Sequence, residues 1–148
     1  MQAVVMTQAG GPEVLEYKAI TEPQVSTPYQ VKVKIRAAGV NPIDTKVRRM
    51  AMFYPDALPA VLGCDLAGEI VELGTEVKQF KLGDKVWACH GGLGNEQGNY
   101  AEYTVIDARW LALMPTTAAF TTAAAAPLVL ITAWGALFER GALQAGET

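Results

Sequence analysis

The clearest pattern in the chain is the segment VKVKIR at residues 31–36, in which apolar and basic residues alternate strictly. Successive side chains of a strand point to opposite faces, so this alternation predicts a half-buried strand with its three aliphatic residues inward. A glycine follows, and then Asn41 and Pro42. Proline at a first helical position sacrifices no needed donor, so we expect a short helix to begin at Pro42 with Asn41 as its N-cap.

Other short apolar segments are separated by glycine and proline turns, which predicts a mainly β chain. Closing many short strands into a barrel removes exposed sheet edges, so we expect a closed or nearly closed barrel. Small residues at Ala67 and Gly68 indicate a close approach on one side of a strand. The further strands are expected near residues 3–6, 15–17, 63–74, 86–89 and 100–106.

The pattern changes to helix near Pro115. An alanine-rich helix is expected to begin with Thr116 or Thr117 as its cap and to stop near Pro127. A second helix over residues 127–138 is apolar all round and therefore needs burial on every side. We accordingly divide the chain into a β domain at residues 1–115 and a helical segment at residues 116–148.

Composition and charge exclude several classes of protein. The chain has 148 residues, 51% of them hydrophobic, and its 12 basic and 15 acidic side chains give a net charge of -3. A globular domain is therefore expected, and no cationic surface for nucleic acid. Two cysteines and the lack of a signal-peptide pattern favour a cytoplasmic protein. The uncharged segment at residues 118–138 raises a membrane anchor as an alternative, but Pro127 and several threonines argue against it.

Motifs along the whole chain resemble one family. The chain is similar to the amino-terminal, GroES-like domain of the zinc-free quinone oxidoreductase branch of the medium-chain dehydrogenase/reductase superfamily. The resemblance implies a mainly β (α+β) fold, a GroES-like partly open β-barrel with C-terminal linking helices. The motifs that carry it, in the expected order, are VKVKIRAAGVNPIDTKVR at 31–48, GCDLAG at 63–68, VELG at 71–74, GDKV at 83–86, GNYAEYTV at 98–105 and PLVLITAW at 127–134.

The resemblance implies an oxidoreductase that transfers hydride from NADPH to a quinone or an α,β-unsaturated carbonyl without zinc. It also implies a dinucleotide-binding domain after Thr148, because no strand in this chain leads into a glycine-rich phosphate turn. We therefore expect the 148-residue chain to be inactive by itself. The intact protein is expected to act on a small molecule, to be a homo-oligomer and to bind neither nucleic acid nor a membrane.

The same resemblance assigns candidate site residues. It implies catalytic roles for Asn41, Asp44 and Tyr54, and places Asn41 and Thr132 near the nicotinamide. Each has a structural alternative: Asn41 as a helix cap, Asp44 as a carboxylate favoured by the helix dipole, Tyr54 as a surface aromatic, and Thr132 bonded to a carbonyl one turn earlier.

The zinc-binding relatives of this family suggest a test for a metal. Their ligand positions correspond here to Asn41 and Cys64, with Asp65 in place of a glutamate. An amide is a poor zinc ligand, so no metal is expected. Lys46 stands where a tyrosine is frequent, which leaves the substrate open. A zinc-type alcohol dehydrogenase relative and a non-enzymatic GroES-like interaction module remain as alternatives.

Overall fold

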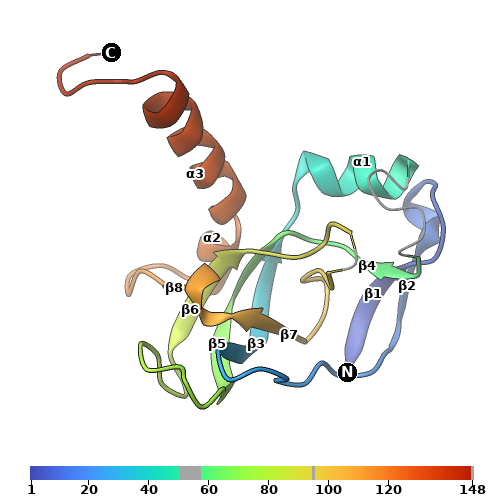
Figure 1. The fold of residues 1–148 in the computed structure, drawn as a ribbon. Coiled ribbons are helices and arrows are strands. Elements are labelled where there is room, and N and C mark those ends of the chain that lie inside the picture. Colours follow the sequence, from blue (N-terminus) through green and yellow to red (C-terminus); the bar gives the residue numbers. More distant parts are fainter. Residues whose placement is uncertain (51–57, 95, 148) are drawn as a thin grey trace.

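The structure, a computed structural model, describes residues 1–50, 58–94 and 96–147 (Figure 1). Strands dominate this part of the chain, and most of its helical residues lie in α1 and near the C-terminal end. The strands are β1 (Gln2–Met6), β2 (Leu15–Ala19), β3 (Gln30–Gly39), β4 (Ala60–Val61), β5 (Asp65–Leu73), β6 (Lys85–Cys89), β7 (Tyr103–Asp107) and β8 (Ala112–Leu113). The α-helices are α1 (Pro42–Met50), α2 (Phe120–Ala124) and α3 (Pro127–Trp134), with short 3-10 helices at Pro12–Val14 and Ala108–Trp110 and a π-helical turn at Gly135–Arg140.

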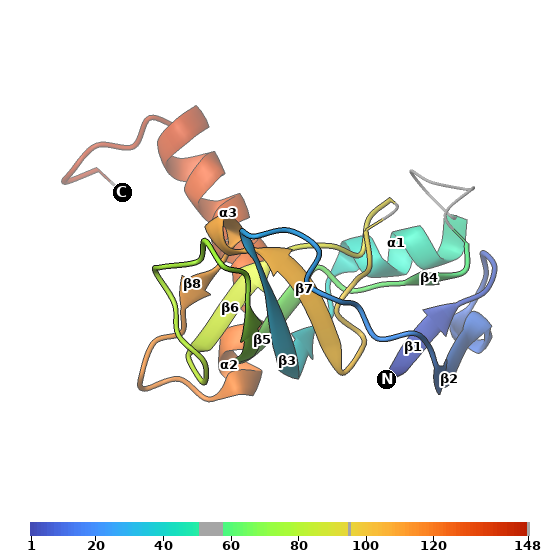
Figure 2. The ribbon, with the colours of Figure 1, turned by 60° about the horizontal axis from the view of Figure 1, so that its bottom comes forward.

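The strands form two open antiparallel sheets. One has the order β2–β1–β4 and the other the order β7–β3–β5–β6–β8. In the described residues no hydrogen-bonded ladder joins β7 to β8, so the larger sheet curves without closing. The mainly β fold class is thus confirmed, and its barrel is an open one (Figure 2).

Strand β3 lies at the centre of the larger sheet and carries its core. Val31 and Val33 are fully buried against Ile70 and Ile106 from the two neighbouring strands, β5 and β7. The alternation in the sequence therefore predicted Val31 and Val33 correctly, whereas Ile35 is only partly buried. It placed every lysine outward, however, and that was wrong for one of them.

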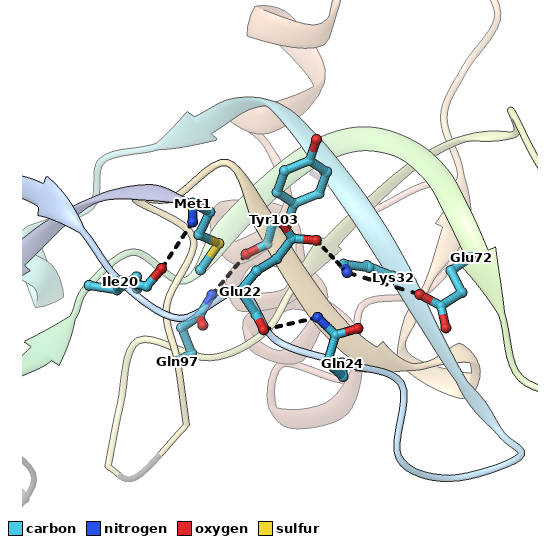
Figure 3. Close-up of polar contacts among 8 residues, drawn as sticks. All are labelled: Met1, Ile20, Glu22, Gln24, Lys32, Glu72, Gln97 and Tyr103. Atoms are coloured by element: carbon cyan, nitrogen blue, oxygen red, sulfur yellow. Dashed lines mark hydrogen bonds and ion pairs between the residues drawn. The ribbon is translucent and has the colours of Figure 1, made fainter.

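Lys32 is buried although the pattern predicted an exposed side chain. Its ammonium group pairs with Glu22, on the segment that leads into β3, and lies 5.7 Å from the centre of the Tyr103 ring (Figure 3). Glu72 on β5 is a more distant partner, at 4.0 Å. A lysine can bury its alkyl stem when its charged end is paired in this way. The pair attaches the β2–β3 connection to the outer face of the sheet.

The C-terminal helices differ in part from the expectation. Helix α2 begins only at Phe120, and its N-cap, Ala119, makes no side-chain hydrogen bond, so the predicted threonine cap is wrong. Helix α3 begins at Pro127 as predicted and extends away from both sheets (Figures 1 and 2). Its apolar side chains are largely exposed, Ile131 and Trp134 by 60% each. Over the ranges described, no helix has both the length and the hydropathy that a bilayer crossing requires.

Candidate functional site

The first part of the site forms where β3 ends and α1 begins. The backbone N–H of Asn41 donates to Asp44 Oδ2 at 2.7 Å, and the N–H of Asp44 donates to the Asn41 carbonyl at 3.0 Å. The expected cap is therefore reversed: the residue in the first turn caps Asn41 instead of the Asn41 side chain capping the helix. This leaves the Asn41 carboxamide available for another partner.

That partner is Asp65, the first residue of β5, which has no exposed surface. Asn41 Nδ2 donates to Asp65 Oδ2 at 2.9 Å, and the backbone N–H of Leu128 in α3 donates to Asp65 Oδ1, also at 2.9 Å. Antiparallel pairing sets Asp65 opposite Gly39, the last residue of β3. Burial raises the pKa of Asp65, while its hydrogen bonds from Asn41, Leu128 and Cys89 act in the opposite direction.

Asp44 is buried as well, and it lies in the first turn of α1, where the helix dipole favours a carboxylate. Besides the Asn41 N–H, it accepts a hydrogen bond from the Tyr100 hydroxyl at 3.0 Å and lies 3.9 Å from the Cys64 thiol. Burial, with the Asp44 charge second, raises the pKa of Tyr100 above its ordinary range and that of Cys64 to about 12. Both groups therefore remain protonated donors to Asp44 at neutral pH.

A cavity of about 480 Å³ opens beside these groups. Two residues join the cavity wall to the polar cluster of Asn41, Asp44 and Asp65. Cys64 lies beside Asp44, and Leu128 donates its N–H to Asp65. A space of this size accommodates a small organic molecule, and its lining is mainly apolar with a few polar groups, as is usual for ligand sites. The remaining lining residues include Ile43, Cys89, His90, Leu93 and Trp110.

Thr132 and Tyr54 are the other two predicted site residues. Thr132 is exposed on α3, and its hydroxyl donates to the Leu128 carbonyl at 2.8 Å, which is the structural alternative named for it. The hydroxyl oxygen keeps its acceptor capacity, so this bond does not exclude contact with a ligand. Tyr54 lies outside the described residues. The structure thus joins Asn41 and Asp44 directly, and links Asn41 through Asp65 to the helix that carries Thr132.

The chemistry of the donors does not fit a zinc ion. An amide binds a metal only through its oxygen and is a poor zinc ligand, and burial, which raises the pKa of Cys64, disfavours the thiolate that zinc requires. Burial and the Asp65 charge likewise raise the pKa of Cys89 to about 11. In residues 1–50, 58–94 and 96–147 no three side chains of the His, Cys, Asp or Glu type gather as a metal site would need.

A nucleotide would find only part of its binding site in the described residues. All strand pairings there are antiparallel, whereas a dinucleotide fold needs parallel strands with a glycine-rich turn between strand and helix. Asn41 and Thr132 do not line the cavity themselves, but Thr132 donates to Leu128, which does, and Asn41 bonds to Asp44, which lies beside the lining residue Cys64. The described residues therefore offer no site for the phosphates of such a cofactor.

Sequence reasoning missed the two residues that hold the cluster together, Asp65 and Tyr100. Asp65 was considered only as a substitute for a metal-neighbouring glutamate, and Tyr100 only as the start of a strand. The available signal for Asp65 was a carboxylate at the first position of a strand, followed directly by the apolar or small residues at 66–68. For Tyr100 there was none, because its partner Asp44 is far away in the sequence.

Comparison with known proteins gives consistent results. The family model described as the alcohol dehydrogenase GroES-like domain matches residues 27–116. Mus musculus quinone oxidoreductase is 36% identical over 148 residues, covering 100% of this chain and 44% of the relative. The chloroplastic NADPH-dependent alkenal/one oxidoreductase of Arabidopsis thaliana is 38% identical over 139 residues, 90% of this chain and 36% of the relative.

A solved structure agrees with these sequence relatives. The Escherichia coli quinone oxidoreductase complexed with NADPH superposes with a TM-score of 0.82 at 31% identity, covering 97% of this chain and 42% of that one. The chain thus spans less than half the length of the proteins it matches.

Proposed function

The chain belongs to the alcohol dehydrogenase GroES-like domain family, in the quinone oxidoreductase-like branch of the medium-chain dehydrogenase/reductase superfamily, and from this we propose a function. We propose that it is the substrate-side part of an NADPH-dependent, zinc-independent oxidoreductase. The proposed reaction is hydride transfer to a quinone or to the β-carbon of an α,β-unsaturated carbonyl. The named activities of the relatives support this substrate class.

The observation that carries the proposal is the Asn41 carboxamide. Asn41 is 5% exposed, its carboxamide donates to Asp65 and its backbone N–H donates to Asp44. Cys64, which lies beside Asp44, lines the cavity of about 480 Å³. A buried amide held so firmly beside an apolar space is suited to orient a polar ligand group that must enter in one geometry. Helix capping alone does not account for the arrangement, because the Asn41 side chain makes no cap bond.

In the proposed reaction the protein binds, orients and excludes water. When bound, NADPH supplies the hydride. The aliphatic and aromatic wall around Ile43, Leu93 and Trp110 surrounds a planar apolar substrate and keeps water away from it. Asn41 and Thr132 contact the nicotinamide end of the cofactor. Asp44 sets the Asn41 backbone, and Tyr54 is proposed to face the substrate.

We also propose the domain division and the setting of the whole protein. Residues 1–115 form the GroES-like domain, and residues 116–148 lead to a dinucleotide-binding domain that holds the phosphates. Leu130, Ile131 and Trp134 on α3 are more than half exposed, and a second domain packed against that face would bury them. The intact enzyme is proposed to be cytoplasmic and homo-oligomeric, and the 148-residue chain inactive by itself.

The experiment uses the full-length protein and its Asn41→Ala variant. The wild type should oxidise NADPH when a quinone or an enone is added, in buffer that contains a metal chelator. Loss of one charge-assisted or neutral hydrogen bond to the ligand corresponds to about 10-fold lower kcat/KM in the variant. Unchanged kinetics would reduce Asn41 to a structural residue, and activity that disappears with chelation would favour the zinc-type alternative.

The exposed face of α3 favours one second candidate, a GroES-like module that binds another protein through this helix. NADPH binding and complex formation through α3 distinguish the two candidates. A full-length protein that binds no NADPH and forms a stable complex through α3 would be the interaction module and not the enzyme.

A further inference from the structure

Asp65 determines the orientation of the Asn41 carboxamide, that is, whether its nitrogen or its oxygen faces Asp65. A carboxylate only accepts hydrogen bonds, so the group of Asn41 that faces Asp65 Oδ2 at 2.9 Å must be the amide nitrogen. The alternative orientation would set two oxygens against each other in a buried position, since Asp65 has no exposed surface. The Asn41 oxygen, Oδ1, is therefore directed away from Asp65.

Asn41 Oδ1 is the other polar atom of the carboxamide. Among the residues that the structure describes, no donor reaches it. A ligand that meets Asn41 here finds a hydrogen-bond acceptor. It must offer a donor in return, such as a sugar hydroxyl or an amide N–H.

The second oxygen of Asp65 reaches a different segment of the chain. It accepts the N–H of Leu128 at 2.9 Å, in the first turn of α3, where backbone N–H groups have no partner inside the helix. A negative charge at this end is also favoured by the helix dipole. One turn later, the Thr132 hydroxyl donates to the Leu128 carbonyl at 2.8 Å. The same carboxylate thus holds the carboxamide of Asn41 and the beginning of the helix that carries Thr132.

We propose that Asp65 is a positioning residue: it directs Asn41 Oδ1 toward the ligand as an acceptor and sets the first turn of α3 relative to it. The proposal rests on the proposed function, in which Asn41 and Thr132 contact the nicotinamide end of NADPH. Asp65 itself touches neither cofactor nor substrate. Its effect is to make the site recognise a donor group, such as a ribose hydroxyl, at one defined place.

Exchanging the two residues tests this without changing the net charge. In Asp65→Asn alone, the new amide donates as well as accepts, so the Asn41 carboxamide can rotate and lose its defined orientation. In the double variant Asn41→Asp with Asp65→Asn, the new amide donates to the new carboxylate and still accepts from Leu128 N–H. The second oxygen at position 41 then faces the ligand as an acceptor again.

The first readout is NADPH affinity of the full-length protein, measured by nicotinamide fluorescence. Asp65→Asn should weaken binding about 10-fold, as expected for one misdirected buried hydrogen bond. The double variant should recover to within about threefold of the wild type. Ile70→Val, a truncation in the buried middle of the same strand, is the control for general destabilisation and should leave affinity unchanged.

The second readout needs neither NADPH nor a folded variant. In the wild-type 148-residue chain, the Asn41 side-chain amide proton should be shifted downfield in the NMR spectrum and should follow the titration of Asp65. An Asn41 amide resonance that does not respond to that titration overturns the proposal. So does a double variant that folds but binds NADPH no better than Asp65→Asn. A wild-type protein that binds no NADPH refutes the proposed function, and the amide spectrum then decides on Asp65 alone.

Discussion

Replacing Gly39 with alanine tests the junction on which the site depends. Gly39 pairs with Asp65 across β3 and β5, and α2 packs directly over it. A Cβ at position 39 would overlap the carbonyl oxygen of Ala124 and lie 2.9 Å from Asp65 Cβ. The backbone of α2 and Asp65 would both have to move, and neither contacting atom is the free end of a flexible side chain.

The magnitude follows from the cost of overpacking, which is about 1–3 kcal/mol for one extra carbon in a rigid environment. With a change of about 2 kcal/mol and an m-value of about 2 kcal/mol/M, the urea midpoint should fall by about 1 M. The matched control is Gly135→Ala, because a Cβ there meets only Glu139 Oε2, at 3.6 Å. In a helical backbone that exchange should stabilise the chain by about 0.5–1 kcal/mol.

The assay is urea unfolding of the 148-residue chain, followed by tryptophan fluorescence and circular dichroism. The fluorescence and dichroism midpoints should coincide for each protein, as two-state unfolding requires. If Gly39→Ala unfolds at the same urea concentration as the wild type, α2 and Asp65 do not approach β3 as closely as the structure indicates, and the geometry of the site is wrong.

Three further predictions concern other parts of the molecule. Burial raises the pKa of Cys64 to about 12 and that of Cys89 to about 11, so iodoacetamide should modify native Cys89 slowly and Cys64 more slowly still. Mass spectrometry measures the labelling, and equal rates in the native and unfolded chains would contradict this. Burial lowers the pKa of His90 below 6.5, so its contribution to stability is present above that pH and is lost as the pH falls through the folded-state pKa. His90→Gln should therefore lose less stability than the wild type between about pH 7 and pH 5. Urea midpoints that fall by the same amount in both proteins over this pH range would refute the assignment. The apolar face of α3 should make the 148-residue chain self-associate with rising concentration, and Ile131→Gln should reduce this; a wild-type chain that stays monomeric in sedimentation would count against it.

The β part of the fold could be predicted because local patterns determine it. The alternation in β3 and the glycine and proline turns located the long strands to within a few residues. The two-residue strands β4 and β8 were missed, because so short a segment carries no period. Lys32 was assigned to the wrong environment for a different reason: its partner Glu22 and the ring of Tyr103 lie elsewhere in the sequence, and periodicity does not report such pairs.

The same distinction between local patterns and long-range contacts applies to the candidate site. Asn41 and Asp44 were chosen correctly as neighbours, because a helix start has a local signature. The direction of the cap was wrong, since it depends on where Asp65 lies, and only the pairing of β3 with β5 determines that. Thr132 was placed on the helix that carries it, and the contacts of Tyr54 stay a prediction. The residues that long-range pairing brings together, Asp65 and Tyr100, were the ones that sequence reasoning missed, and only Asp65 had a local signal.

The most direct test of the central claim follows the hydride itself. The full-length protein is given NADPH with deuterium on the transferable position of the nicotinamide, an enone, and a metal chelator, and the saturated ketone is analysed by mass spectrometry. The account predicts one deuterium on the former β-carbon of the enone, with a proton from solvent added at the α-carbon. A product without deuterium, or no product while the chelator is present, would contradict hydride transfer by a zinc-independent reductase.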